Sequence, residues 1–301
     1  MLTTEQIKQK AKELGADLCG VGDISLFSDK NPQRDPRMIL PSGKCVIGAA
    51  FRVPRGLYRL METKSQYYNY VTMGVKYPDE ELAEIFLLKM ASFIEDQGYD
   101  ACVQRNVSNL RIKGDKTQNP ELIDTYELIH AEPVEAGKPA PDVIMDFAEA
   151  ARICGLGAES MNGSILTKKF GPYVRFVFIV TDLPLECDAP FEGSLCDNCG
   201  ACIDACPGHA ISDEGKDTWQ CSVYYRGAHR DNPYMTEDFL KGNPEREAIL
   251  NGDKRFDAES ARAIYPELNF MPDFCGYTPC LCGKACDTVC YQHLKEAGIL
   301  E

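Results

Sequence analysis

The first residues of the chain show the hydrophobic spacing of a short amphipathic helix. In TTEQIKQKAKELGAD (3–17), apolar side chains recur every three or four residues and polar side chains fill the positions between them. Thr3 offers a hydroxyl cap with Gln6 three residues later, and Gly15 is a typical helix stop. The pattern therefore predicts a helix that begins after Thr3 and ends before Gly15.

Four further segments have clear helical or extended patterns. The continuous apolar run CVIGAAFRV (45–53) predicts a buried strand, and YVRFVFIVTD (173–182) predicts another. DEELAEIFLLKMASFIEDQG (79–98) has the period of a long amphipathic helix, and PDVIMDFAEAARICGLG (141–157) is a second helix that runs into glycines. Because strands and helices mix without strict βαβ alternation, we expect an α+β fold and not a doubly wound parallel sheet.

The distribution of cysteines divides the chain into two parts. Five of the fifteen cysteines lie before residue 190, and the other ten lie after it. A length of 301 residues also favours two domains. We therefore predict one domain over residues 1–185 and a second over residues 186–301. Within the second, the polar stretch 211–270 is rich in Gly, Pro and Asn and is expected to form an ordered excursion with short helices.

The composition narrows the partners and the compartment. The chain has 46 acidic and 32 basic residues, a formal charge of −14, which repels phosphate backbones and makes nucleic acid an unlikely partner. A small basic patch that docks one RNA stays open. No run of about eighteen apolar residues and no basic leader before an apolar core occurs, so we expect a cytoplasmic protein without a membrane partner. Since cytoplasmic thiols are kept reduced, fifteen cysteines indicate metal or cluster ligation.

One cysteine run has the spacing of an iron–sulfur ligand set. Cys196, Cys199, Cys202 and Cys206 form C-x2-C-x2-C-x3-C, and Pro207 completes the pattern of bacterial two-cluster ferredoxins. In that pattern three thiolates converge on one cubane and the fourth binds a different cluster. A zinc site would need only two pairs of ligands and no proline after the last cysteine. The run therefore predicts iron–sulfur binding.

The second half of the ligand set is less regular. The downstream cysteines outnumber the four that are needed: Cys221, Cys275, Cys280, Cys282, Cys286 and Cys290. Our assignment groups Cys290 with Cys196, Cys199 and Cys202, and it groups Cys282, Cys286 and Cys221 with Cys206. The C-x3-C step from Cys282 to Cys286 is one residue longer than usual, so Cys280 or Cys275 is an alternative ligand. Tyr291 also replaces the proline that usually follows the last ligand, which leaves an unusually ligated second cluster open.

These motifs together resemble a known superfamily. AARICGLGAESMNGSILTKKFGPYVRFVFIVTDLPLE (150–186), followed by CDNCGACIDACPGHAI (196–211), is similar to the epoxyqueuosine reductases and reductive dehalogenases. The segments 7–25 and 67–101 also resemble that superfamily. The resemblance implies a nitroreductase-like domain that holds cobalamin, next to a ferredoxin-like domain with two [4Fe–4S] clusters. It implies an anaerobic reductase that takes electrons from a low-potential ferredoxin or flavodoxin and passes them to a small-molecule substrate.

The resemblance also implies particular site residues. The corrinoid would be lined by residues of the matching segment: Gly155, Gly157, Asn162, Gly163, Ser164, Gly171 and Arg175. For each glycine taken singly, a tight turn between helix and strand is an equal alternative. The proton-donor candidates are Asp142, Asp146 and Glu149, while Tyr173 stands where relatives often have arginine. An electron carrier without its own substrate, or a protein that binds FMN in place of cobalamin, remains the alternative function.

Overall fold

The computed structural model describes residues 2–28, 32–106, 133, 135–136, 138–141, 143–272 and 276–301. The proton-donor candidate Asp142 and the alternative ligand Cys275 lie outside the described residues. Among the described residues, helices and strands mix as the sequence predicts, and no helix combines the length and apolar character needed for a membrane crossing.

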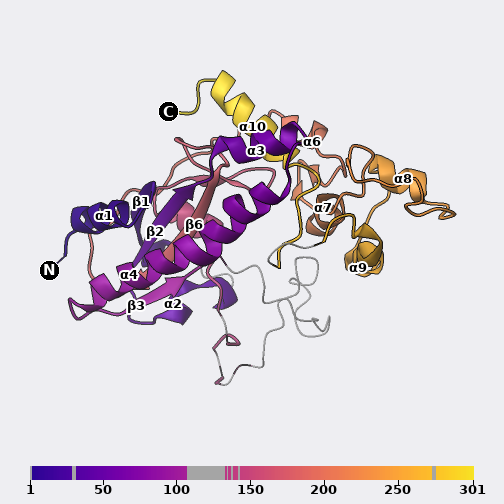
Figure 1. The fold of residues 1–301 in the computed structure, drawn as a ribbon. Coiled ribbons are helices and arrows are strands. Elements are labelled where there is room, and N and C mark those ends of the chain that lie inside the picture. The colour runs from indigo at the N-terminus through magenta and orange to yellow at the C-terminus, as the bar shows by residue number, and fades with distance from the viewer. Residues whose placement is uncertain are drawn as a thin grey trace.

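A four-stranded antiparallel sheet forms the centre of the N-terminal part (Figure 1). Its order is β1 (Leu18–Asp23), β2 (Cys45–Arg52), β6 (Val174–Thr181) and β3 (Ala101–Gln104). The two central strands, β2 and β6, are the two apolar runs that the sequence indicated. They pair over eight residues, from Cys45 opposite Thr181 to Arg52 opposite Val174.

Two helices cover one face of the sheet (Figure 1). They are α1 (Thr4–Glu13) and α4 (Ala83–Glu95), and α4 continues a π-helix, η3 (Tyr70–Leu82). The predicted cap of α1 is confirmed, because Thr3 and Gln6 form a reciprocal capping box. Phe86 of α4 packs edge to face on Phe51 of β2, with ring centroids 5.4 Å apart.

The opposite face carries a second apolar core beneath α5 (Phe147–Ile153) and α2 (Pro36–Ile39). The short hairpin β4 (Ala158–Glu159) and β5 (Ile165–Leu166) follows α5. Strand β1 lies so close to the end of α5 that a Cβ at Gly20 would sit 2.0 Å from the carbonyl oxygen of Cys154. The glycine is therefore required for this approach of helix and strand.

The C-terminal part is a series of short elements. In chain order these are α6 (Ala201–Asp204), β7 (Ile211–Ser212), β8 (Gly215–Lys216), α7 (Thr218–Tyr225), α8 (Arg246–Asn251), α9 (Ala258–Ile264) and α10 (Ala285–Glu296). This part also contains the 3₁₀ turn η5 (Tyr265–Leu268). The N-terminal part contains two further 3₁₀ turns, η1 (Ile24–Leu26) and η2 (Pro32–Arg34), and the helix α3 (Arg55–Glu62). The polar excursion 211–270 thus contains short helices, as expected.

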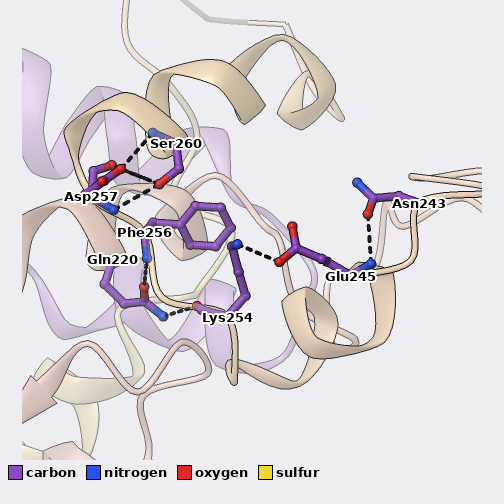
Figure 2. Close-up of polar contacts among 7 residues, drawn as sticks. All are labelled: Gln220, Asn243, Glu245, Lys254, Phe256, Asp257 and Ser260. Carbon is purple, nitrogen blue, oxygen red and sulfur yellow. Dashed lines mark hydrogen bonds and ion pairs between the residues drawn. The ribbon is translucent and has the colours of Figure 1, made fainter.

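A buried glutamine organises this excursion (Figure 2). Gln220 donates to the carbonyl oxygens of Gly208 and Lys254 and accepts a hydrogen bond from the backbone N–H of Phe256. A capping box between Asp257 and Ser260 then starts α9. Because Gln220 precedes Cys221, these bonds also fix the position of a predicted cluster ligand.

The last helix returns to the N-terminal part and packs against it (Figure 1). Tyr173, at the start of β6, is stacked between Tyr58 of α3 at 3.8 Å and Tyr291 of α10 at 4.5 Å, measured between ring centroids. Asp188, just after the predicted boundary at 185, accepts hydrogen bonds from Lys8 and from the backbone N–H of Val21. Contacts of this kind join the two parts across the predicted domain boundary.

Candidate functional site

Four cysteines from two distant segments surround one small cavity. Cys196, Cys199 and Cys202 come from the loop and first turn of α6, and Cys290 comes from α10. The loop can fold tightly because Gly200, with φ of +77°, precedes α6. The structure thus brings together the four residues that the spacing assigned to one cluster. Their role as ligands stays a prediction.

A second group of four cysteines lies where α7 meets the start of α10. Burial raises the pKa of Cys221 to about 11, and the negative charges of ionised Cys282 and Cys206 contribute to this increase. Burial likewise raises the pKa of Cys286, with contributions from Cys282 and Cys221. Electrostatic interactions thus link the four residues that the sequence assigned to the other cluster, and their role as ligands stays a prediction.

The surplus cysteine in this region is a close neighbour of a predicted ligand. The Sγ atoms of Cys280 and Cys282 are 3.7 Å apart, and Cys280 is fully buried. Cys280 therefore remains the alternative to Cys282 that the irregular spacing suggested. The Sγ of Cys206 accepts a hydrogen bond from the backbone N–H of Ala210 at 3.3 Å.

Both groups fit iron–sulfur clusters by the chemistry of their donors. Each consists of four cysteines, which is the ligand type of [4Fe–4S] centres. Burial raises the pKa of Cys290 to about 12 and that of Cys221 to about 11. Because clusters bind thiolates, their uptake must release protons from these thiols.

The rim of the first group contains an ion pair that the sequence did not indicate. His293 Nε2 lies 2.8 Å from Asp197 Oδ2, and the hydrogen bond from His293 lowers the pKa of Asp197. Ligand atoms of Asp197, His293 and Cys199 lie within 4.8 Å of one another. Cys199 is exposed, so this edge of the first group faces solvent.

A larger cavity of about 440 Å³ lies between the sheet and the second group of cysteines. Its wall includes three of the predicted corrinoid residues, Gly163, Ser164 and Arg175, together with Lys284 and Asp287 of α10. The volume falls within the range of about 300–1,000 Å³ that is usual for ligand sites. This cavity is therefore the candidate cofactor site.

A charged network joins α10 to the loop that borders the cavity. Asp287, which is 2% exposed, accepts a hydrogen bond from Ser164 Oγ at 2.7 Å and one from Asn162 Nδ2 at 3.3 Å. Lys284 Nζ lies 3.0 Å from the other carboxylate oxygen of Asp287. The loop 162–164 and the helix that carries Cys286 are thereby held in one arrangement.

Not all predicted corrinoid residues reach this cavity. A Cβ at Gly157 would lie 2.1 Å from the carbonyl oxygen of Leu166, and a Cβ at Gly155 would lie 2.7 Å from that of Ala189. A Cβ at Gly171 would lie 3.4 Å from the side chain of Tyr291 in α10. Gly155 and Gly157 thus allow a close approach of backbone, and Gly171 has a φ of +54°, so the turn interpretation explains all three. Buried Asn162 borders the first cysteine cavity instead.

The predicted proton donors differ in position. Asp146 lines the cavity, caps α5 by accepting from Ala148 and Glu149, and lies 3.5 Å from Arg34. Glu149 accepts a hydrogen bond from the backbone N–H of Ser28 and does not line the cavity. Of the two described candidates, Asp146 is therefore the one that borders the cavity.

The sequence missed another carboxyl group in the same cavity. Glu159 of β4 lines it, and burial, followed by the charge of Asp146, raises the pKa of Glu159. Its neighbours Lys216 and Arg34 partly offset that shift. Glu159 lies two residues after the GLG motif (155–157), which was the only signal, while Lys284 and Asp287 were visible only as neighbours of Cys286.

Comparisons with known sequences identify relatives of this chain. Residues 190–212 match the family model described as "4Fe-4S binding domain". The epoxyqueuosine reductase of Bacillus subtilis is 24% identical over 295 residues, covering 90% of this chain and 64% of the relative. That of Leadbetterella byssophila is 23% identical, covering 73% of this chain and 68% of the relative. A tetrachloroethene reductive dehalogenase of Desulfitobacterium hafniense is 44% identical over 63 residues, which cover 20% of this chain and 11% of the relative.

Solved structures extend the comparison to the fold. A catabolic reductive dehalogenase in complex with 3-bromo-4-hydroxybenzoic acid superposes with a TM-score of 0.50 at 17% identity, covering 97% of this chain and 36% of that one. An epoxyqueuosine reductase with a modified tRNA stem loop gives a TM-score of 0.48 at 18% identity, covering 91% of this chain and 68% of that one. That structure contains a tRNA stem loop, and the prediction that nucleic acid is an unlikely partner of this chain stays a prediction.

Proposed function

We propose that this chain, which belongs to the superfamily of epoxyqueuosine reductases and reductive dehalogenases, is an iron–sulfur reductase with two [4Fe–4S] clusters and a corrinoid. The observation that carries the proposal is the order of the three sites. One group of four cysteines reaches solvent at Cys199, and the other lies next to the cavity that Lys284 and Asp287 border. In this order, electrons would enter at the first group of cysteines, pass through the second group and reach the cavity.

The exposed edge of the first group is the proposed entry. A low-potential ferredoxin or flavodoxin docks there and reduces the cluster held by Cys196, Cys199, Cys202 and Cys290. The cluster held by Cys206, Cys221, Cys282 and Cys286 then passes electrons toward the cavity. Both ligand sets rest on the spacing in the sequence and on the proximity of the thiols.

The polar groups in the wall of the cavity suit an organic cofactor. Gly163 leaves its part of the wall without a side chain, and Arg34 offers hydrogen-bond donors there. A bound corrinoid would supply a cobalt centre that transfers electrons to the substrate. The protein itself orients the substrate and delivers a proton from Asp146 or Glu159, of which Glu159 has the raised pKa that favours the protonated acid.

Metal and flavin analysis of anaerobically purified protein tests the proposal. We expect about eight irons per chain, from two cubanes, and cobalt after cobalamin is added. Cys206→Ser should lower the iron content toward about four per chain. Cys102→Ser is the matched control, because Cys102 lies on β3, away from both groups. Flavin in place of cobalt would favour the FMN alternative, and iron without either cofactor would favour the electron carrier.

The substrate is best tested with both kinds that the relatives take. A halogenated phenol and an epoxyqueuosine-modified tRNA stem loop should be offered to the same reduced protein. The formal charge of −14 opposes binding of RNA, so we expect turnover of the small organic molecule. Turnover of the tRNA alone would reverse that assignment and leave the proposed cofactors intact.

A further inference from the structure

The pair Lys284 and Asp287 occupies an unusual position between the two proposed cofactor sites. Lys284 is two residues from both Cys282 and Cys286, and it has the left-handed φ of +52° that non-glycine residues seldom adopt. Asp287 directly follows Cys286, whose Sγ lies 3.9 Å from Asp287 Oδ1. Two opposite charges therefore lie beside one predicted ligand of the second cluster.

The surroundings keep these charges in place and poorly solvated. Asp287 is held from the N-terminal part by Ser164 and Asn162, as described above. The side chain of Lys284 is 27% exposed, and it borders the cavity. Tyr58 and Tyr70, both 3% exposed, also line the cavity. In such an environment a fixed charge acts more strongly on its neighbours than it would in water.

We propose that Lys284 and Asp287 set the reduction potential of the cluster held by Cys286, and that they act in opposite directions. Reduction adds one electron, and therefore negative charge, to a cluster. A fixed ammonium group favours the reduced state and a fixed carboxylate disfavours it, which is how charge tunes iron–sulfur potentials. The inference rests on the proposed function, because it requires the second cluster.

The consequence for the molecule is that the pair affects one of the two proposed clusters more than the other. The first cavity is bordered by Asn162, whose side chain also bonds Asp287, but Lys284 does not border it. The pair thus acts mainly on the cluster next to the larger cavity. Loss of Lys284 would make that cluster harder to reduce, and loss of the Asp287 charge would make it easier.

Anaerobic redox titration of the iron-loaded protein, followed by electron paramagnetic resonance, tests this inference. Lys284→Gln should shift the potential of one cluster to a more negative value, and Asp287→Asn should shift the same cluster to a more positive value. The double variant should return toward the parent. The amide of Asp287→Asn can still accept hydrogen bonds from Ser164 and Asn162, so this variant keeps the loop attached.

Two exposed residues provide matched controls. Lys10 and Glu13 of α1 form an ion pair with the same i, i+3 spacing, 4.0 Å apart, on a helix that packs on the sheet away from α10 (Figure 1). Lys10→Gln and Glu13→Gln should leave both potentials unchanged. If Lys284→Gln does not assemble clusters, Lys284→Arg, which keeps the charge and should keep the potential, decides the question together with Asp287→Asn.

The outcomes separate this inference from the proposed function. Shifts of the same sign in the two single variants, equal shifts of both clusters, or no shift would overturn the role of the pair while leaving two clusters in place. A parent protein with about four irons per chain would instead contradict the second cluster itself.

Discussion

Arg175→Gln should lower the free energy of unfolding by about 3–5 kcal/mol, because it leaves a buried carboxylate without its partner. Arg175 of β6 forms a two-pronged ion pair with Asp79 of the π-helix, with Nε 2.9 Å from Oδ1 and a second contact from the guanidinium to Oδ2. The side chain of Asp79 is only 7% exposed, so water cannot replace the guanidinium.

Replacement of the other partner of this ion pair should lower the free energy of unfolding by less. Asp79→Asn leaves Arg175 charged, but 26% of that side chain is exposed and it borders the cavity, where water can solvate it. We expect a loss of about 1–3 kcal/mol, the usual range for an impaired buried hydrogen bond. In Asp79→Asn/Arg175→Gln no charge remains, so the double variant should be more stable than Arg175→Gln alone.

Anaerobic urea titrations followed by circular dichroism measure these differences. The surface pair Arg105 and Glu84, at 2.8 Å and with 43% and 46% of the side chains exposed, is the control. Arg105→Gln should cost about 0–1 kcal/mol. If Arg175→Gln costs no more than Arg105→Gln, or if the double variant shows simple additivity, the pairing argument is wrong and Arg175 is free to serve a cofactor.

Three further predictions follow from other contacts. Tyr291→Pro should cost about 3 kcal/mol, because position 291 lies inside α10, whereas Tyr291→Leu should cost only about 1 kcal/mol for the lost stacking on Tyr173; urea titration compares them. Reconstitution with iron and sulfide should speed up from pH 7 to pH 9, because the pKa of Cys221 is raised to about 11 and that of Cys290 to about 12; the absorbance near the cluster bands measures it, and a flat profile contradicts the argument. Burial lowers the pKa of His229, so protonation favours the unfolded chain and stability should fall as the pH drops below about 6.5, less steeply in His229→Gln; parallel pH profiles in urea that do not differ would refute this.

The sequence predicted those features whose physical cause is local. The cap of α1 depends on residues three apart, and the apolar runs of β2 and β6 need only the hydrophobic pattern. The first ligand run is likewise a matter of spacing within a short loop. In each case the information lies within about a dozen residues.

Other features depend on contacts between distant segments. Tyr173 and Tyr291 each departed from the pattern of relatives, and the structure explains both at once, because the two rings stack on one another. Burial and the charge of Asp146 raise the pKa of Glu159, and neither cause is visible in the local sequence AES (158–160). The glycines at 155 and 157 could not be told from cavity residues, since what a Cβ would meet there comes from other parts of the chain.

Helix α10 shows why the proposed clusters and the cavity would act as one unit. Cys286 and Cys290 are four residues apart on this helix, about 6 Å along its axis, yet each belongs to a different group of thiols. Between them, Asp287 bonds the loop at Ser164, and after them Tyr291 stacks on Tyr173. A single rigid element would therefore fix the separation of the two clusters and the distance of the second from the cavity. A change that bends α10, such as Tyr291→Pro, should impair electron transfer to the cavity even where the iron content is unchanged.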